Sequence, residues 1–247
     1  NRQPRFIAHI RSELPCGFAH RHRKRETAMS DILNEGLSEL GFAQSSIPLF
    51  AQKLGTYIKE LQLFNSAYNL VNTSGFEELA IRHIFDSLAA HDIINSLAAD
   101  IRSEDGICVG DIGSGGGLPG IPLAVVFPQF RFTLVERMDR RCAFLENCAA
   151  MLGLQNLTVQ KSEAEKIPRE SFDIAVFRAL KPLDARFAKT LLSLIKKGGY
   201  LAAYKAKKTN IENEMNAIRS VIADYTLTEV RVPFMKDAER NIVVVKK

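Results

Sequence analysis

The chain has 247 residues and a mass of 27.5 kDa; 46% of its residues are hydrophobic, 25% are charged, and the mean hydropathy is −0.05. These values are typical of a folded globular protein and exclude a disordered or fibrous chain. The sequence has no run of about 18 apolar residues, so it encodes no membrane-spanning helix. Cys16, Cys108, Cys142 and Cys148 show no C-x-x-C spacing. We therefore expect no disulfide framework, no bound metal and a reducing, cytoplasmic location.

The net charge of +5 comes from the first 28 residues. That segment has seven Lys or Arg residues against two Glu residues, whereas residues 29–247 have 26 basic and 26 acidic residues. Three interpretations fit such a segment: an upstream extension foreign to the natural protein, an arm that binds RNA phosphates, or an acid-poor transit peptide. Met29 then precedes Ser30 and Asp31, a good helix start. We expect residues 1–28 to be a basic leader outside the fold.

Residues 29–100 are expected to form a helical region in front of the main domain. Ser30 caps a first helix that Gly41 ends, and Ser46 caps a second, longer helix. The apolar residues of the second helix recur with a period near 3.6, which predicts one buried face: Leu49, Leu54, Ile58, Leu61 and Phe64.

A third helix is expected to begin near Phe76. Its apolar residues fall at positions i, i+3, i+4 and i+7 and predict a single buried face: Ile81, Ile84, Phe85 and Leu88. This leaves four polar residues on the other faces: Arg82, His83, Asp86 and Ser87.

From residue 101 to residue 247 the sequence alternates between strands and helices. Apolar segments predict strands at 107–112, 131–136, 157–162, 172–177, 199–205, 227–232 and 241–247, and helices are expected at 118–127, 139–152, 163–166 and 183–196. Alternating strands and helices predict an α/β fold with a mostly parallel, doubly wound seven-stranded sheet. The last two strands follow each other without a helix, which predicts an antiparallel pair at the end.

The most specific motif is Asp111-Ile-Gly-Ser-Gly-Gly-Gly-Leu-Pro-Gly120, between a predicted strand and a predicted helix. Glycines there permit tight turns and close approach of a ligand. Gly115, Gly117 and Gly120 fit the G-x-G-x-x-G pattern of nicotinamide cofactors. However, an acid two residues before the first glycine of a G-x-G-x-G run, with Glu136 at the end of the next strand, resembles the S-adenosyl-L-methionine (AdoMet) loop of class I methyltransferases.

DIGSGGGLPGIPLA, then FTLVE and RRCAFL, closely resembles the RsmG/GidB family. The likeness extends from Tyr68-Asn69-Leu70 and residues 82–88 to residues 240–244. It implies a class I, Rossmann-like AdoMet-dependent methyltransferase domain at 101–247 with an N-terminal helical extension. It also implies the activity, methylation of N7 of a guanine (guanine 527) in bacterial 16S rRNA. The expected partner is 16S rRNA or the small ribosomal subunit, and the expected state is a monomer.

The expected cofactor contacts come from two sources. The resemblance places AdoMet contacts on Gly113, Leu118, Ala164, Glu165 and Arg178. The residue pattern adds Gly115 and Gly117 as close-approach glycines and Glu136 as the acceptor for both ribose hydroxyls. It also adds Asp111, which either contacts the methionine amine or orders the loop.

Two further side chains are candidates for a role near the target base. Arg178 offers a planar donor fork for phosphate or guanine O6, with a structural salt bridge as the alternative. His83 is the second candidate; it and Asp86 also fit a structural pair on one helix.

The sequence constrains the chemistry of methyl transfer. Enzymes that methylate exocyclic amines commonly carry an [Asp/Asn]-Pro-Pro-[Tyr/Phe] loop, whereas residues 177–182 read FRALKP. Cys142 and Cys148 lie mid-helix as small apolar residues, which argues against a cysteine nucleophile. Guanine N7 carries no proton, so its methylation needs no general base. Two alternatives stay open: a nicotinamide-dependent oxidoreductase and a non-catalytic AdoMet-binding ribosome factor.

Overall fold

The computed structural model describes residues 30–68, 70–178, 183–236 and 238–247, so the predicted leader lies outside the described residues. The first part is helical, as expected. Residues 30–39 form a helix, and Gly41 follows it with a φ of +85°. Helix α2 (Ile47–Tyr68) begins directly after Ser46. Helix α5 (His91–Asp100) closes the helical region.

The third predicted helix is irregular, and the prediction is wrong for two of its four polar residues, Asp86 and Ser87. It consists of α3 (Phe76–Leu79), a π-helical segment η1 (Ala80–Phe85) and α4 (Asp86–Leu88). Five consecutive residues, 84–88, are buried, including Asp86 and Ser87. The wider π turn shifts the register of side chains that follow it. The polar groups are satisfied inside: the Tyr204 hydroxyl donates to the carbonyl of Ser87, and Asp86 accepts from two arginines.

The seven expected strands form one sheet. They are β1 (Cys108–Ile112), β2 (Arg131–Glu136), β3 (Leu157–Lys161), β4 (Phe172–Arg178), β5 (Ile195–Lys205), β6 (Thr226–Glu229) and β7 (Asn241–Lys246), in the order β3-β2-β1-β4-β5-β7-β6. The first five are parallel, and β7 pairs antiparallel with both β5 and β6. This confirms the mostly parallel sheet and its antiparallel end. The parallel strands therefore all end at one edge.

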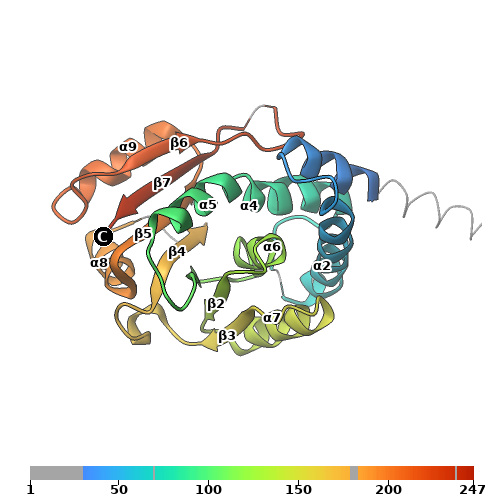
Figure 1. The fold of residues 1–247 in the computed structure, drawn as a ribbon, viewed down its shortest axis with the longest axis horizontal. Helices are drawn as coiled ribbons and strands as arrows, with labels where there is room; N and C mark the ends of the chain where they lie inside the picture. Colours follow the sequence, from blue (N-terminus) through green and yellow to red (C-terminus); the bar gives the residue numbers. More distant parts are fainter. Residues whose placement is uncertain (1–29, 69, 179–182, 237) are drawn as a thin grey trace, which may run out of the picture.

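Helices cover both faces of the sheet (Figure 1). One core joins the N-terminal helices to α6 (Gly120–Val126) and α7 (Asp139–Met151). A second core joins α8 (Ala185–Leu194) and α9 (Lys208–Ala217) to the other face. The 3₁₀ helix η2 (Ala164–Lys166) lies between β3 and β4. None of the helices within the described ranges is long and apolar enough to span a membrane.

Two element predictions need correction. Helix α9 was not predicted; its buried Ile211, Met215 and Ile218 follow helical spacing, but the polar residues around them hide the pattern. The helix expected at 183–196 ends at Leu194, because β5 begins at Ile195. That strand is therefore longer than its apolar segment, and Lys196 at its start pairs with Asp173.

Candidate active site and cofactor loop

The glycine loop connects β1 to α6 at the carboxyl edge of the sheet. Gly113, Gly115 and Gly117 have φ values of +72°, +57° and +88°, which favour glycine. A Cβ on Gly117 would lie 2.5 Å from Ile121, so this glycine permits close packing. A Cβ on Gly115 would meet nothing closer than 3.9 Å, so the backbone there borders open space. Gly115 is thus the loop position where a ligand finds room.

The helical region supports this loop directly. The hydroxyl of Tyr57, fully buried in α2, donates to the carbonyl of Gly116. Leu61 of the same helix lies 3.6 Å from the position of a Gly116 Cβ. The loop is also joined to the sheet, since the amides of Gly113 and Ser114 both donate to the carbonyl of Val135. Helix α2 and strand β2 therefore fix the loop before any ligand binds.

Asp111, at the end of β1, orders the loop. Its Oδ2 accepts from the Gly120 amide at 3.0 Å, and its carbonyl accepts from the Ser114 hydroxyl at 2.9 Å. Oδ1 is buried and has no hydrogen-bond partner in the described structure. Burial raises the pKa of this carboxyl to about 7, although the Gly120 amide and Ser114 oppose the shift. Contact between Asp111 and the methionine amine stays a prediction.

Glu136, at the end of β2, faces the same loop. Its Oε2 accepts from the Gly115 amide at 3.0 Å, and its Oε1 accepts from the amides of Arg137 and Met138 at 2.9 Å. The side chain is buried, and Arg141 Nη1 lies 3.9 Å from Oε2. A carboxylate has about four lone-pair sites, so it keeps acceptor capacity for a further donor. Glu136 is therefore held in a fixed orientation beside Gly115.

The remaining predicted cofactor residues lie in different surroundings. Leu118 is buried in the turn that leads into α6, and its amide donates to the carbonyl of Ser114. Ala164 and Glu165 lie in η2, just beyond the end of β3; Ala164 is half-buried and Glu165 is exposed. Because β3 neighbours β2, η2 follows the strand next to the one that ends at Glu136.

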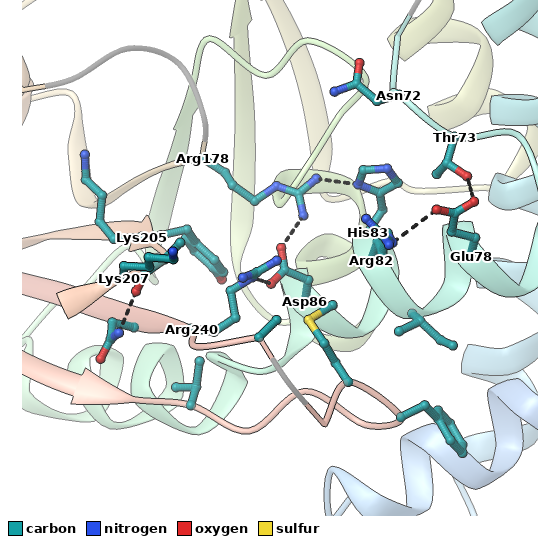
Figure 2. Close-up of a pocket in the computed structure, with 18 of the residues that line it drawn as sticks. Asn72, Thr73, Glu78, Arg82, His83, Asp86, Arg178, Lys205, Lys207 and Arg240 are labelled. Carbon is teal, nitrogen blue, oxygen red and sulfur yellow. Dashed lines mark hydrogen bonds and ion pairs between the residues drawn. The ribbon is translucent and has the colours of Figure 1, made fainter. Parts of the chain in front are cut away.

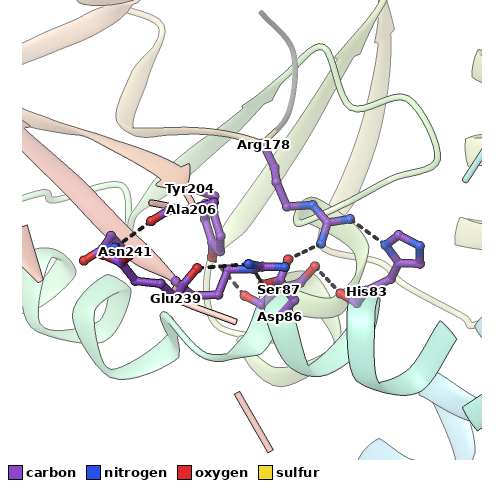
Figure 3. Close-up of polar contacts among 9 residues, drawn as sticks. His83, Asp86, Ser87, Arg178, Tyr204, Ala206, Glu239 and Asn241 are labelled. Atoms are coloured by element: carbon purple, nitrogen blue, oxygen red, sulfur yellow. Dashed lines mark hydrogen bonds and ion pairs between the residues drawn. The ribbon is translucent and has the colours of Figure 1, made fainter. Parts of the chain in front are cut away.

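Arg178, at the end of β4, belongs to a polar cluster rather than to the glycine loop. Its Nη1 donates to Asp86 Oδ2 at 2.8 Å, and its Nη2 lies 3.2 Å from His83 Nδ1. Nε of Arg240 donates to the other oxygen, Asp86 Oδ1, at 2.7 Å. Figure 3 shows the Arg178 guanidinium between the His83 ring and the Asp86 carboxylate. His83 and Asp86 thus meet through Arg178.

The cluster borders a cavity of about 1310 Å³ (Figure 2). Arg178 is the one predicted cofactor residue, within the described ranges, that lines it. Its wall carries four acidic side chains (Glu77, Glu78, Asp86 and Glu214) and six basic ones: Arg82, Arg178, Lys205, Lys207, Lys236 and Arg240. Since β4 pairs with β1, this cavity and the glycine loop lie at the same carboxyl edge. A polyanionic substrate would find positive charge there.

Arg240 is the member of this cluster whose role sequence reasoning missed. It was noted only as part of the C-terminal likeness. It lies 154 residues from Asp86, at the start of β7, and no spacing rule connects the two. Its antiparallel strand brings it back to the carboxyl edge. The only available signal was the polar Glu239-Arg240-Asn241 run before an apolar strand.

Other catalytic chemistry finds little support in the described residues. They contain no group of three or more His, Cys, Asp or Glu side chains able to hold a metal. Cys142 and Cys148 are buried, and burial raises the pKa of both thiols, which disfavours the nucleophilic thiolate. Residues 179–182, part of the FRALKP segment that stands where an amine-acceptor loop would be, lie outside the described part of the chain, as does Asn69.

Solved structures identify the class of fold. A SAM-dependent methyltransferase from Aquifex aeolicus superposes with a TM-score of 0.51 and 19% identity, covering 77% of this chain and 97% of that one. The tRNA (m1A58) methyltransferase TrmI from Aquifex aeolicus gives a TM-score of 0.50 and 12% identity, covering 64% of this chain and 68% of that one. The fold is therefore the class I, Rossmann-like methyltransferase fold that the sequence predicted.

Sequence comparison then identifies the family. The GidB family model, rRNA small subunit methyltransferase G, matches residues 50–243. The ribosomal RNA small subunit methyltransferase G of Treponema denticola is 35% identical over 246 residues, which cover 90% of this chain and 96% of that protein. The protein of the same name from Francisella tularensis is 29% identical and covers 89% and 98%. The chain belongs to this family of methyltransferases.

Proposed function

We propose that the chain transfers a methyl group from AdoMet to N7 of a guanine in 16S rRNA. The observation that carries this proposal is the loop in which Asp111, Gly115 and Glu136 meet, in a chain of this family. The names of the relatives supply the rRNA substrate, and the family resemblance supplies the guanine N7 target. Membership of a methyltransferase family also favours this function over a nicotinamide-dependent oxidoreductase.

The residues of the loop fit AdoMet. Gly115 leaves room for close approach, Glu136 is oriented to accept hydrogen bonds from ribose hydroxyls, and Asp111 keeps one unpartnered oxygen for an ammonium group. When bound, AdoMet supplies an electrophilic methyl group on a sulfonium. Six further residues complete the proposed set of contacts: Gly113, Gly117, Leu118, Ala164, Glu165 and Arg178. Glu165 and η2 follow β3, at the side where the adenine of a nucleotide would lie beyond Glu136.

The cavity beside Arg178 fits the acceptor nucleotide. It lies at the same edge as the cofactor loop, and basic side chains in its wall attract phosphates. N7 of guanine has an in-plane lone pair and no proton, so proximity and alignment suffice, and effective molarity alone supplies roughly 7–11 kcal/mol. The surroundings of His83 also argue against a general base. Burial, and next the positive charge of Arg178, lowers the pKa of His83 to about 4. A group that weakly basic is a poor general base at neutral pH.

The decisive experiment is methylation of small-subunit rRNA with labelled AdoMet, followed by borohydride–aniline cleavage, which is specific for 7-methylguanine. We expect incorporation and cleavage at one guanine. Incorporation into an adenine or an exocyclic amine would contradict the N7 target, and AdoMet binding without incorporation would indicate the non-catalytic ribosome factor.

The role of Glu136 is tested in the same assay. Glu136→Ala is expected to weaken AdoMet binding, since hydrogen bonds to a charged group contribute about 1.5–3 kcal/mol each. The methyl step at saturating AdoMet should change much less. Titration calorimetry measures the affinity, and Glu104→Ala, at an exposed acid before β1, is the matched control. Glu136→Gln keeps the size of the side chain and one acceptor oxygen but removes the charge, so it tests how much the charged form contributes to AdoMet binding. Unchanged AdoMet affinity in both Glu136 variants would contradict the assignment.

A further inference from the structure

The tautomer of His83 is fixed by its neighbour. Its Nδ1 lies 3.2 Å from Nη2 of Arg178, and a guanidinium only donates hydrogen bonds. Nδ1 must therefore accept, so it carries no proton. Burial, together with the Arg178 charge, lowers the pKa of the ring to about 4, which leaves the imidazole neutral at physiological pH. The one proton of the neutral ring is then on Nε2.

That Nε2–H group has no acceptor. Nε2 is buried and unpartnered in the described structure, although the ring lines the cavity together with Arg178. Both oxygens of Asp86 already accept from arginines, and no hydrogen bond joins them to Nε2. A buried donor without a partner is costly and rare in folded proteins. Figure 2 shows the ring with Arg178 on one side and the segment that carries Asn72 and Thr73 on the other. The ring thus lines the cavity and carries an unused donor that is buried beside it.

We propose that His83 determines the base specificity of the methyl acceptor, by donating a hydrogen bond from Nε2–H to O6 of the target guanine. This inference rests on the proposed function. Beside N7, guanine presents the acceptor O6, whereas adenine presents the N6 amino donor, which Nε2–H would oppose. The donor cannot be directed at N7 itself, because the N7 lone pair attacks the methyl group.

The charge of the cluster supports a neutral donor at this position. Methylation at N7 leaves the purine with a positive charge. Arg178 and Arg240 already place two guanidinium groups beside a single carboxylate, Asp86. A protonated His83 would add a further positive charge next to the cationic product, whereas the neutral ring donates the same hydrogen bond without that repulsion.

Two matched variants separate the donor from the structural role. His83→Asn keeps an acceptor oxygen near the position of Nδ1 for Arg178 but has no donor near Nε2. His83→Gln places an amide nitrogen near Nε2. We expect His83→Asn to lower kcat/KM on rRNA roughly 10- to 100-fold, the range for an unpaired buried polar group, and His83→Gln to restore much of the loss. AdoMet affinity should stay unchanged in both. Equal losses, or no loss, would overturn the proposal.

A change in the substrate tests the contact even if a variant folds poorly. 2-Aminopurine at the target position lacks O6 but keeps N7. The parent protein should methylate the 2-aminopurine RNA roughly 10-fold or more below guanine RNA, and His83→Asn should show a much smaller difference between the two RNAs. Effects on N7 reactivity cancel in this double-mutant cycle. If the parent forms no 7-methylguanine at all, the proposed function fails. If the parent forms 7-methylguanine but the cycle shows no coupling between His83 and O6, only the proposed contact of His83 is overturned.

Discussion

Two glycines with the same left-handed backbone lie in different parts of the fold. Gly115 and Gly153 have φ values of +57° and +59°, and neither has an atom closer than 3.9 Å to the position of a Cβ. Gly115 belongs to the proposed cofactor loop, whereas Gly153 follows the end of α7. The same substitution at both positions therefore introduces the same backbone strain and differs in its effect on a ligand.

Gly115→Val is expected to lose most AdoMet affinity, because the new side chain fills the space where the cofactor approaches. Gly153→Val is the control and should bind AdoMet like the parent. Both variants should lose about 1–2 kcal/mol of stability, since a left-handed residue with a Cβ costs about that much. Calorimetric titration and denaturant unfolding measure the two quantities. If Gly115→Val bound AdoMet as tightly as the parent, the assignment of this loop to the cofactor would be wrong.

Asp111 makes the stability of the fold depend on pH. The pKa of its carboxyl is about 7 in the folded protein, because of burial, and about 3.9 in an unfolded chain. Between these values the native state holds a proton that the unfolded state has lost, so stability falls as pH rises, by up to about 1.4 kcal/mol per pH unit. Asp111→Asn removes this titration. The stability advantage of the parent over the variant should therefore shrink from pH 4 to pH 7. A difference that is constant with pH would contradict the raised pKa.

If methyl transfer uses no general base, its rate should not depend on pH. At saturating AdoMet, the single-turnover rate should be independent of pH between roughly pH 6 and pH 9, the window in which histidines and activated cysteines titrate. His83 titrates below that window. Ionisation of Asp111 should appear in AdoMet affinity rather than in the saturated rate. A bell-shaped profile abolished by one His, Asp or Cys replacement would instead reveal a proton transfer.

The π-helical segment is the element that connects the helical region to the site. It ends directly before Asp86, which accepts from Arg178 of β4 and from Arg240 at the start of β7. Three elements that are distant in sequence thus meet at one carboxylate. π-Bulges occur frequently at functional sites, which agrees with this placement. The apolar pattern did not indicate this segment, because apolar spacing does not distinguish a π turn from an α turn over six residues.

Removing the Asp86 carboxylate should destabilise the fold. Asp86→Ala leaves two guanidinium groups without their partner, and breaking a buried ion pair costs about 3–5 kcal/mol. Arg82→Ala, on the same helical segment, is the control: its pair with Glu78 is exposed and contributes at most about 0.5 kcal/mol. Urea unfolding measures both. If both variants lost the same small amount of stability, Arg178 and Arg240 would be able to replace Asp86 by water or other acceptors.

At the scale of the whole molecule, the sequence predicted what local patterns encode. Five of the strands alternate regularly with four helices, so the parallel sheet and its carboxyl edge follow from topology alone. That topology places the glycine loop and Glu136 at the carboxyl edge. The sequence allowed a salt bridge for Arg178 but could not predict its partner or the role of Arg240, because the ion pairs of Asp86 join residues 92 and 154 positions apart. The burial of Asp86 and Ser87 was mispredicted for the same reason, since their partners come from distant strands.

We expect the fold to begin with the helix that starts at Ser30. Residues 1–28 lack the apolar periodicity needed to pack on a core, so a protein that starts at Met29 should melt at the same temperature and bind AdoMet equally well. A protein that starts at Gly41 is the contrasting case, because it loses Leu33 and Leu37, which are 1% and 0% exposed. Each such side chain contributes about 1.5–3 kcal/mol by its burial, so this second truncation should melt well below the first. Thermal unfolding compares the three proteins.

A large drop in melting temperature on removal of residues 1–28 alone would show that the leader packs on the domain. If the salt dependence of rRNA binding also becomes shallower without it, the leader acts as an arm that contacts phosphates.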